Sequence, residues 1–343
     1  MKKQSIWVLM LSLVFVLSAC GGDTEEVQGE PEENEGPEPE QEQITLRLAE
    51  NQPEDYPTTI GDKEFARLVE EKTDGRIKIE VYAGGQLGDE KSVIEQVQLG
   101  SIELARVNVA PLTEFSEDIG VLTLPYLFDN EEHMWDVLNG EIGDELLATL
   151  EESNMIGLAY YDSGKRSFYN SKRLVTKPED LEGLKIRVQQ SEMFVDLVEA
   201  LGASATPMAY EEVYSAIQTG VLDGAENNYP SYYSSNHYEV AEYFTIDGHS
   251  TVPEVVVASK GTWDELSEED KQILREAAKE SVPVQREAWA DLVAEAEKAV
   301  EENGNEVYIV EDLTPWQEAV EPIYEKYGGQ YQEWLDKIDE TRG

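Results

Sequence analysis

The sequence predicts an α/β fold of two lobes that enclose a ligand-binding cleft between them. Strand-like and helix-like segments alternate from residue 44 onward, and a second alternating series begins near Tyr160. A helix-forming stretch at 262–303 would link the two lobes. The roughly 300 residues beyond the N-terminal segments are enough for two domains of ordinary size. Because open α/β sheets bind ligands at the carboxyl ends of their strands, the cleft between the lobes is the expected site.

The first series has the order strand, helix, strand, helix, strand. Residues 44–48 and 77–81 alternate apolar and polar side chains, the period of two that indicates a strand. Between them, residues 65–72 place their apolar side chains on one helical stripe. A second helix follows the turn-rich loop at 84–89, and 104–109 is a third strand candidate. This order favours an open sheet with right-handed crossovers.

The second series repeats the same alternation. It has a short strand at 186–188, followed by helices at 193–201 and 210–219. The continuous apolar run at 255–258 is typical of a strand that is buried on both faces. A last strand is expected at 307–310.

The helix-forming stretch at 262–303 contains two local signals. Ser267 and Asp270 resemble a capping box inside it. Pro283 should kink or divide the helix, because proline lacks the backbone N–H. The predicted lobes are residues 44–162 with about 253–290 for lobe I, and 163–252 with about 291–343 for lobe II.

The N-terminus predicts export and a lipid anchor. Lys2 and Lys3 precede the apolar run 6–19, which is shorter than the roughly 20 residues of a spanning helix, so residues 1–19 are interpreted as a signal peptide. The run ends at Cys20 in a pattern that resembles a lipoprotein processing box, and this is the chain's single cysteine. An acylated cysteine would anchor the protein to the outer face of the cytoplasmic membrane. An ordinary signal peptide followed by a chance cysteine is the alternative.

Acidic residues dominate the composition. Residues 20–43 carry ten acidic residues and no basic ones, which indicates a disordered, self-repelling tether. The formal charge of the whole chain is −47, so nucleic acid and anionic lipid surfaces are excluded as partners. Adaptation to a salty or alkaline medium explains such a charge. A protein this negative can capture an anion only with a well-placed local cation.

The sequence offers no catalytic or metal-binding pattern. His133, His237 and His249 show no metal-ligand spacing, and no second cysteine is present to help them. No nucleophile elbow, P-loop or dinucleotide fingerprint appears. With 73 acidic residues, a pair of carboxylates seen in the sequence carries no information. We therefore expect no enzyme activity, no metal and no cofactor.

Several ordered blocks carry a family resemblance. They are LEGLKIRV at 181–188, LGASATPM at 201–208 and EEVYSAIQTGVLDGAEN at 211–227, with GQLGD at 85–89 and LPYLF at 124–128 upstream. Together they resemble the DctP-like solute receptors of tripartite ATP-independent periplasmic (TRAP) transporters, over essentially the whole chain after the tether. The resemblance implies a class II periplasmic-binding-protein fold with a hinge, and a ligand carboxylate held by one arginine.

Arg187 occupies the place of that arginine. A guanidinium is permanently charged, and its planar fork matches a carboxylate bidentately. The position between Ile186 and Val188 on a short strand would fix its direction. The alternative is a surface arginine that pairs with one of the many acids.

The resemblance places further residues in the cleft. Asn227 matches a residue that binds the carboxylate through its amide, and Tyr210 matches an aromatic residue that packs on the ligand. Arg166 matches a second cation, and Asn108 matches a position near the distal end of the ligand. Glu50 and Asn51, directly after the first strand, are expected at the cleft as well.

The segment after Asn227, NYPSYYSSNH, resembles a subgroup that binds sugar acids such as hexuronates. Asn228, Tyr229 and His237 would either recognise hydroxyl groups or position other residues. A C4-dicarboxylate would instead need a second cation, which Arg166 would supply. We expect a hexuronate or a related sugar acid, with a C4-dicarboxylate as the alternative.

The mechanism implied is capture without chemistry. The lobes would close around the acid, and the closed receptor would dock on the membrane permease subunits. A receptor for an ABC transporter or a chemosensory system would share the fold. A secreted enzyme that acts on sugar acids would instead show turnover.

Overall fold

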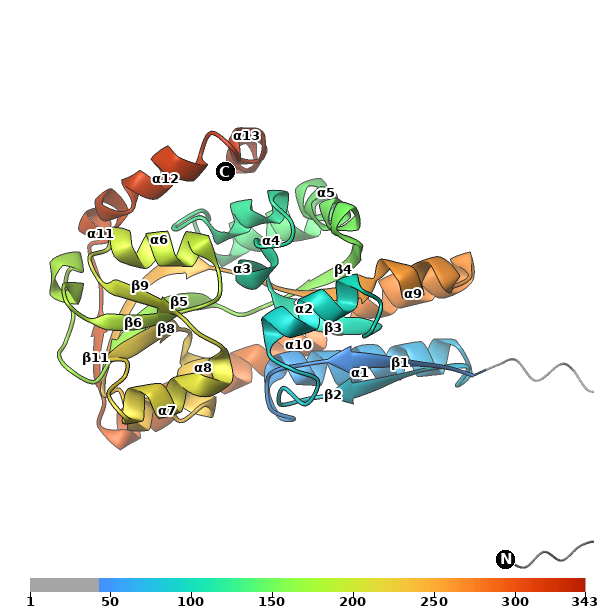
Figure 1. Cartoon of the computed structure of the whole chain (residues 1–343), viewed down its shortest axis with the longest axis horizontal. Coiled ribbons are helices and arrows are strands. Elements are labelled where there is room, and N and C mark those ends of the chain that lie inside the picture. Colours follow the sequence, from blue (N-terminus) through green and yellow to red (C-terminus); the bar gives the residue numbers. More distant parts are fainter. Residues whose placement is uncertain (1–42, 343) are drawn as a thin grey trace, which may run out of the picture. The chain divides into compact units, whose positions relative to one another are not determined.

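The computed structural model of the chain describes residues 43–342 (Figure 1). The predicted signal peptide, Cys20 and most of the acidic tether lie outside these residues. The described part contains two mixed β-sheets with helices around them, which confirms the α/β class.

Five strands form the first sheet. β1 runs parallel to β2 and β3, whereas β10 is antiparallel to both β3 and β4. Helices connect the parallel strands, as the alternating sequence pattern predicted. The strands, in spatial order, are β2 (Ile77–Tyr82), β1 (Ile44–Ala49), β3 (Leu104–Asn108), β10 (Glu254–Ser259) and β4 (Met155–Tyr161).

The helices of this part connect and cover the first sheet. α1 has a proline, Pro57, at its first position, and its apolar stripe buries Phe65 and Val69 in the core. Asp89 caps α2 by accepting a hydrogen bond from the backbone N–H of Ser92, which places Glu90 in the first turn. The helices are α1 (Pro57–Lys72), α2 (Glu90–Gln98), α3 (Val109–Leu112), α4 (Glu131–Asn139) and α5 (Glu141–Thr149), with 3-10 turns at Asp118–Thr123 and Leu150–Ser153.

Six strands form the second sheet. β5 is antiparallel to its neighbours β8 and β9, whereas β6 runs parallel to β7 and β8, and β11 runs parallel to β9. The strands, in spatial order, are β11 (Glu306–Ile309), β9 (Tyr243–Thr251), β5 (Lys165–Asn170), β8 (Gly224–Asn227), β6 (Lys185–Val188) and β7 (Ser204–Pro207). Its helices are α6 (Glu192–Ala200), α7 (Val213–Gln218) and α8 (Tyr229–Ser234), with 3-10 turns at Pro178–Leu181, Tyr210–Glu212 and His237–Glu239.

A long C-terminal helix links the two sheets, as predicted, but its start and its continuity differ from the expectation. α9 (Lys260–Glu265) is separate, and α10 (Glu268–Asn303) is capped by Ser267, whose hydroxyl accepts from the backbone N–H of Asp270. Pro283 does not divide α10. Residues buried on both sides of it, such as Leu274 and Trp289, hold the helix in place, so the loss of one hydrogen bond is tolerated.

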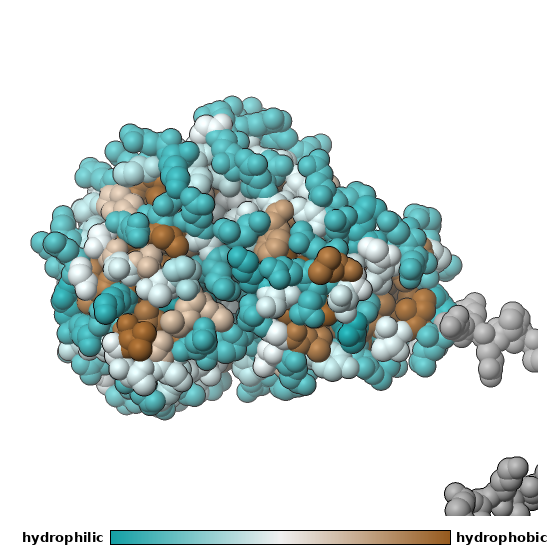
Figure 2. Space-filling view, in the orientation of Figure 1, coloured by the Kyte–Doolittle hydropathy of each residue, from teal (hydrophilic) through white to brown (hydrophobic). Residues whose placement is uncertain are grey.

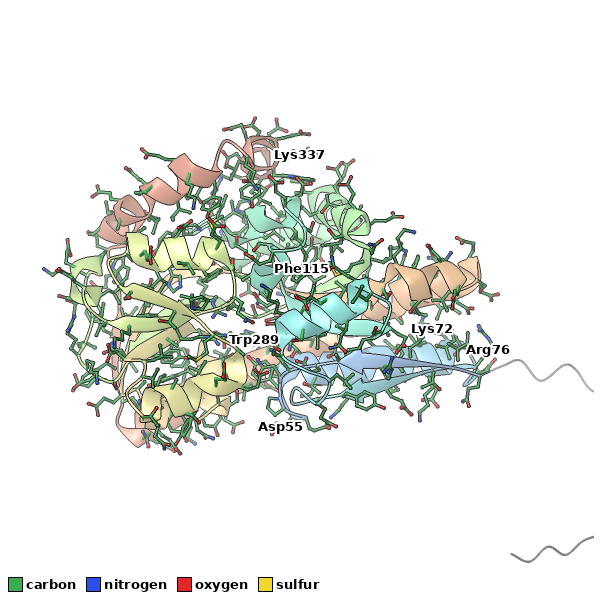
Figure 3. All side chains as sticks on the ribbon, in the orientation of Figure 1. Asp55, Lys72, Arg76, Phe115, Trp289 and Lys337 are labelled. Atoms are coloured by element: carbon green, nitrogen blue, oxygen red, sulfur yellow. The ribbon has the colours of Figure 1, made fainter. Side chains whose placement is uncertain are left out.

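The chain crosses between the sheets at residues 162–164, at 252–253 and along α10. α10 packs against α1 on one side and α8 on the other. Trp289 of α10 lies at this junction (Figure 3), where its ring meets Tyr56 edge to face at 6.1 Å. Gly164 is in the left-handed region and a Cβ there would lie 2.9 Å from the Trp289 ring, so this crossing requires glycine.

The last three helices of the chain pack against helices of both sheets. α11 (Thr314–Ala319) is followed by α12 (Glu321–Tyr327), which packs on α6, and by α13 (Gln332–Glu340), which packs on α5 (Figure 1). The Tyr324 hydroxyl donates to the carbonyl of Pro125, and Lys337 pairs with Glu145 at 2.6 Å. The C-terminal helices therefore contact α6, which belongs to the second sheet, and α5, which belongs to the first.

The visible surface is mostly hydrophilic, with small scattered apolar areas (Figure 2). This agrees with the acidic composition, because charged side chains keep the surface hydrated. Within residues 43–342 no helix is both long enough and apolar enough to cross a membrane.

Candidate ligand-binding cleft

Residues from both sheets line a narrow, partly open cavity. On one side it is bounded by segments that follow β1 and by β3, and on the other by β5, β6 and β8. Another hollow, of about 1220 Å³, surrounds Trp289 and contains none of the predicted site residues. The lining residues of the narrow cavity are Asn51, Gln52, Glu90, Arg106, Asn108, Arg166, Arg187, Gln189, Tyr210, Asn227, Asn228, Ser231 and Glu254.

Arg187 lies on β6 with its guanidinium in the cavity lining. Ile186 and Val188, on either side, are fully buried and fix the strand. Nε and Nη2 donate to the carbonyl of Met208 at 2.9 and 2.7 Å, and the ring of Tyr210 lies 5.8 Å away. No carboxylate of residues 43–342 forms an ion pair with it, and burial lowers the pKa of Arg187. Arg187 is therefore a buried cation, and its Nη1 has no hydrogen-bond partner in the described part of the chain.

Arg166, in contrast, is neutralised by its neighbour. Its guanidinium makes a two-pronged ion pair with the buried carboxylate of Glu226, and Nη2 also donates to the Glu226 carbonyl at 2.8 Å. Burial raises the pKa of Glu226, but Arg166 and His249 outweigh this effect, so the pKa lies below its usual value. His249 is in turn bonded to Asp247 at 2.9 Å. The charge of Arg166 is therefore balanced without a ligand, whereas that of Arg187 in the same wall is not.

Asn227 and Asn228 stand side by side but have different roles. The Asn227 oxygen accepts from Arg166 Nη1 at 3.1 Å and from the Asn228 backbone N–H at 2.9 Å, whereas no partner within the described chain engages its Nδ2. Asn228 caps α8 through Ser231 N–H and donates to the Ser163 carbonyl. Asn227 thus has a free donor facing the cavity, and the Asn228 side chain is engaged in positioning.

Tyr210 lines the cavity, whereas His237 lies behind it. The Tyr210 hydroxyl is held by Ser235, and its ring meets His237 edge to face at 5.8 Å. His237 is fully buried and does not line the cavity; its Nδ1 bonds the Tyr169 hydroxyl at 2.7 Å. Burial lowers the pKa of His237 to about 3, so the ring is neutral. Tyr229 packs on Phe244, also away from the cavity.

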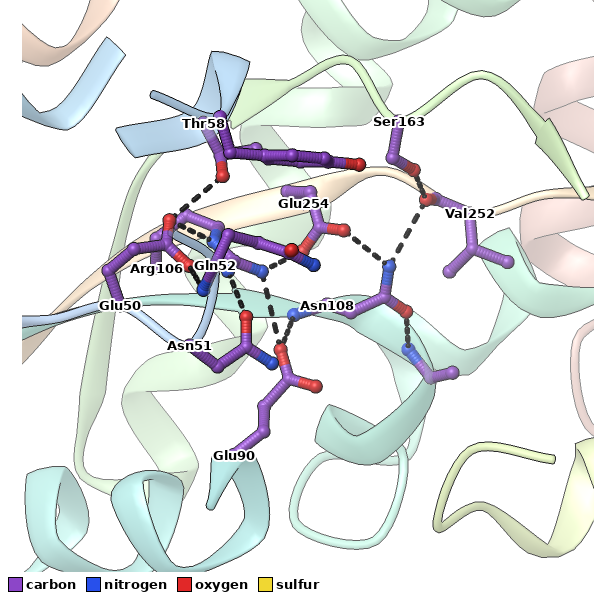
Figure 4. Close-up of polar contacts among 12 residues, drawn as sticks. Glu50, Asn51, Gln52, Thr58, Glu90, Arg106, Asn108, Ser163, Val252 and Glu254 are labelled. Atoms are coloured by element: carbon purple, nitrogen blue, oxygen red, sulfur yellow. Dashed lines mark hydrogen bonds and ion pairs between the residues drawn. The ribbon is translucent and has the colours of Figure 1, made fainter. Parts of the chain in front are cut away.

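The opposite wall is built around Arg106 of β3 (Figure 4). Nε and Nη2 bind the carboxylate of Glu50, and Nη2 also donates to Asn51 Oδ1. Nη1 donates to Glu254 at 2.6 Å and to Glu90 at 3.4 Å. Every N–H of Arg106 is therefore engaged. Glu50 is buried beneath the wall and is not among the cavity-lining residues.

Asn108 holds the parts of this wall together. Its Nδ2 donates to Glu254 at 2.9 Å, and its Oδ1 caps α3 by accepting from the backbone N–H of Ala110. Its own backbone N–H donates to Glu90 at 2.7 Å. Burial and the nearby Glu254 raise the pKa of Glu90 to about 8.

Sequence reasoning missed six of the lining residues. Arg106 had a visible signal, because a charged residue stands in the middle of an otherwise apolar strand, LARVN. Glu254 had a similar signal, directly before the apolar run VVVA. The missed residues are Gln52, Glu90, Arg106, Gln189, Ser231 and Glu254. In the described residues, no group of three histidine, cysteine or acidic side chains is placed to hold a metal.

Comparison with known proteins identifies close relatives. The model of the family described as "Bacterial extracellular solute-binding protein, family 7" matches residues 48–330. A solute-binding protein from Chromohalobacter salexigens is 40% identical over 275 residues, which are 80% of this chain and 82% of that protein. The C4-dicarboxylate-binding protein DctB of Bacillus subtilis is 30% identical over 84% of this chain and 83% of its own length.

Solved structures match the fold closely. A TRAP periplasmic solute-binding protein from Bradyrhizobium, in complex with galacturonate, has a TM-score of 0.85 and 43% identity, and the match covers 86% of this chain and 99% of that one. One from Pseudomonas putida F1, with bound D-glucuronate, has a TM-score of 0.84 and 37% identity over 86% of this chain and 97% of that one. These matches confirm the predicted two-lobed binding-protein fold.

Proposed function

Because this chain belongs to family 7 of the bacterial extracellular solute-binding proteins, the receptors of TRAP transporters, we propose that it captures a hexuronate or a related sugar acid through Arg187. The observation that carries this proposal is the unequal state of the three arginines that line the cavity. Arg106 and Arg166 each have a carboxylate partner, whereas Arg187 has none among residues 43–342.

A buried guanidinium without a counter-ion is unfavourable, because it has lost its water and gained no anion. An incoming carboxylate removes this penalty and can bind the free face of Arg187. The free Nδ2 of Asn227 supplies a second donor, and the ring of Tyr210 offers an apolar face to the ligand. The three groups together suit a carboxylate that is attached to a compact ring.

The structural neighbours favour a hexuronate. Those from Bradyrhizobium and Pseudomonas putida F1 hold galacturonate and glucuronate, at 43% and 37% identity. A C4-dicarboxylate is the second candidate, because the Bacillus subtilis relative is named for that ligand, but its identity is lower, at 30%. A secreted enzyme for sugar acids would require turnover, which a receptor does not show.

Delivery to the membrane follows from the N-terminus. We propose that Cys20 is acylated, that residues 20–43 tether the receptor, and that the closed receptor docks on the TRAP permease subunits. Closure would bend the crossings at 162–164 and 252–253 and bring the Arg187 wall against the Arg106 wall. The ligand stabilises the closed state only through contacts that this state improves.

Titration calorimetry tests the arginine contact. Arg187→Ala is expected to weaken binding of D-galacturonate or D-glucuronate by about 3 kcal/mol, roughly a hundredfold, as for the loss of one partner of a buried charge pair. Arg187→Lys should recover little of the lost affinity, because an ammonium has no planar fork. The control is Arg67→Ala, which removes an exposed arginine on α1. Binding by Arg187→Ala within threefold of the wild type contradicts the proposal, and product formation would favour the enzyme alternative.

A further inference from the structure

We propose that the Arg106 wall determines specificity: it accepts hydroxyl groups and rejects a second carboxylate, and Glu90 is the residue that does both. This inference rests on the proposed function, because it assumes that the ligand's carboxylate is held by Arg187. It goes further in that it names the chemistry required at the other end of the ligand. The ligand class is then a monocarboxylate with several hydroxyl groups.

The first argument is the charge balance of the wall. One guanidinium, that of Arg106, faces the three carboxyl groups of Glu50, Glu90 and Glu254. Its five N–H groups are all engaged, so none is left for an anion from the ligand. Arg166 cannot replace it, because Glu226 already neutralises that guanidinium. A second carboxylate would therefore meet acids without a free cation.

The second argument is the presence of free acceptors. Glu90 Oε1 accepts from the backbone N–H of Asn108, but no donor in the described part of the chain hydrogen-bonds to Oε2. None of the residues drawn in Figure 4 contacts that oxygen either. The side-chain oxygens of Gln52 and Gln189, which also line the cavity, are buried without a hydrogen-bond partner. Buried acceptors without donors, here those of Gln52 and Gln189, are unfavourable, whereas the Glu90 side chain is partly exposed. Hydroxyl groups of a sugar ring would satisfy them, and a carboxylate, which has only acceptors, would not.

The third argument is that Glu90 is held rigidly enough to discriminate between ligands. Asp89 caps the helix on which Glu90 stands, and the backbone N–H of Asn108 fixes one carboxyl oxygen at 2.7 Å. Charged groups surround it from several elements: Arg106 from β3, Glu254 from β10, Arg187 from β6 and Glu211 from the segment after β7. Burial, together with the two acids among them, raises the pKa of Glu90 to about 8. The negative charge of a second ligand carboxylate would add to the repulsion among these acids.

The test compares galacturonate, which closes into a ring, with galactarate, an open chain that carries a second carboxylate, and its readout is the change in their affinity ratio between variants. Galactarate is galacturonate with its first carbon oxidised to a second carboxylate. Calorimetry at pH 9, where Glu90 is ionised, should show the wild type binding galacturonate at least tenfold more tightly than galactarate. Glu90→Gln keeps the size of the side chain but removes its charge, so the ratio of the two affinities should fall about tenfold, as for one charged hydrogen-bond contact. Glu95→Gln, which neutralises an exposed acid on the same helix, α2, is the matched control and should leave the ratio unchanged.

Two further readouts separate specificity from a structural role. At pH 6.5, where Glu90 is largely protonated, the wild-type ratio should approach that of Glu90→Gln. Gln52→Leu removes an acceptor without changing the charge, and it should weaken both ligands severalfold at an unchanged ratio. Equal binding of galactarate and galacturonate by the wild type overturns the inference, as does a ratio in Glu90→Gln equal to the wild-type ratio at pH 9. If the wild type binds neither galacturonate nor glucuronate, the proposed function itself is wrong.

Discussion

Glu226→Gln is expected to lower the free energy of unfolding of the ligand-free protein by about 3–5 kcal/mol, the usual cost of removing one partner from a buried ion pair. Glu226 is fully buried, and its carboxylate accepts hydrogen bonds from two nitrogens of Arg166. It also lies 3.5 Å from His249. A glutamine amide offers one oxygen where two are needed, and its NH₂ would face another donor. The buried charge of Arg166 would then lack its partner.

Urea unfolding without ligand, followed by circular dichroism, measures this loss. Glu71→Gln is the matched control, because Glu71 also pairs with an arginine, Arg67, but at the exposed surface of α1. We expect a change below about 0.5 kcal/mol for it, as for exposed ion pairs in general. A loss below about 1 kcal/mol in Glu226→Gln would refute the reasoning that this pair is what balances the charge of Arg166.

Two further predictions concern pH and anchoring. Burial lowers the pKa of His249, but Asp247 and Glu226 outweigh it and raise the pKa to about 9. Since the folded-state pKa lies above the usual 6.5, the stabilisation that the protonated His249 ring contributes is complete below pH 6.5 and is lost as the pH rises to 9. The difference in unfolding free energy between the wild type and His249→Asn should therefore shrink by about 3 kcal/mol across that range. Cys20→Ser should release the protein from the membrane fraction into the medium, as immunoblotting of both fractions would show, and an unmodified Cys20 in mass spectrometry would contradict the anchor.

The fold was predictable where local pattern decides. The alternation at 44–48 and 77–81 and the apolar run at 255–258 correspond to β1, β2 and β10, because each strand's pattern follows from which of its faces are buried. The outcome at Pro283 was not predictable from local rules. Whether a proline divides a helix depends on the packing at either side, and here α1 and α8 hold α10 along its length.

The candidate site was predictable more fully on one side than on the other. Arg187, Asn227 and Tyr210 lie in neighbouring sequence blocks with a recognisable pattern, and the structure places all three in the cavity lining. In the Arg106 wall, Asn51 and Asn108 were expected as lining residues. The ion pairs of this wall join Glu50 and Glu254, which are 204 positions apart (254 − 50), so no local pattern reveals which charges pair. The sequence could also not show that His237 faces Tyr169 and not the cavity.

The excess of acid in this protein has a consequence for how it can bind an anion. A net charge of −47 repels anions at long range, but salt screens such repulsion beyond about 10 Å at 0.1 M, so the groups within the cavity decide. There, acids neutralise Arg106 and Arg166 and leave Arg187 unpaired among the described residues. Three free cations would hold an anionic group in several orientations with similar energy. If Arg187 binds the carboxylate as we propose, a single unpaired cation opposite a wall of acceptors would permit one orientation, with the hydroxyl groups at Glu90.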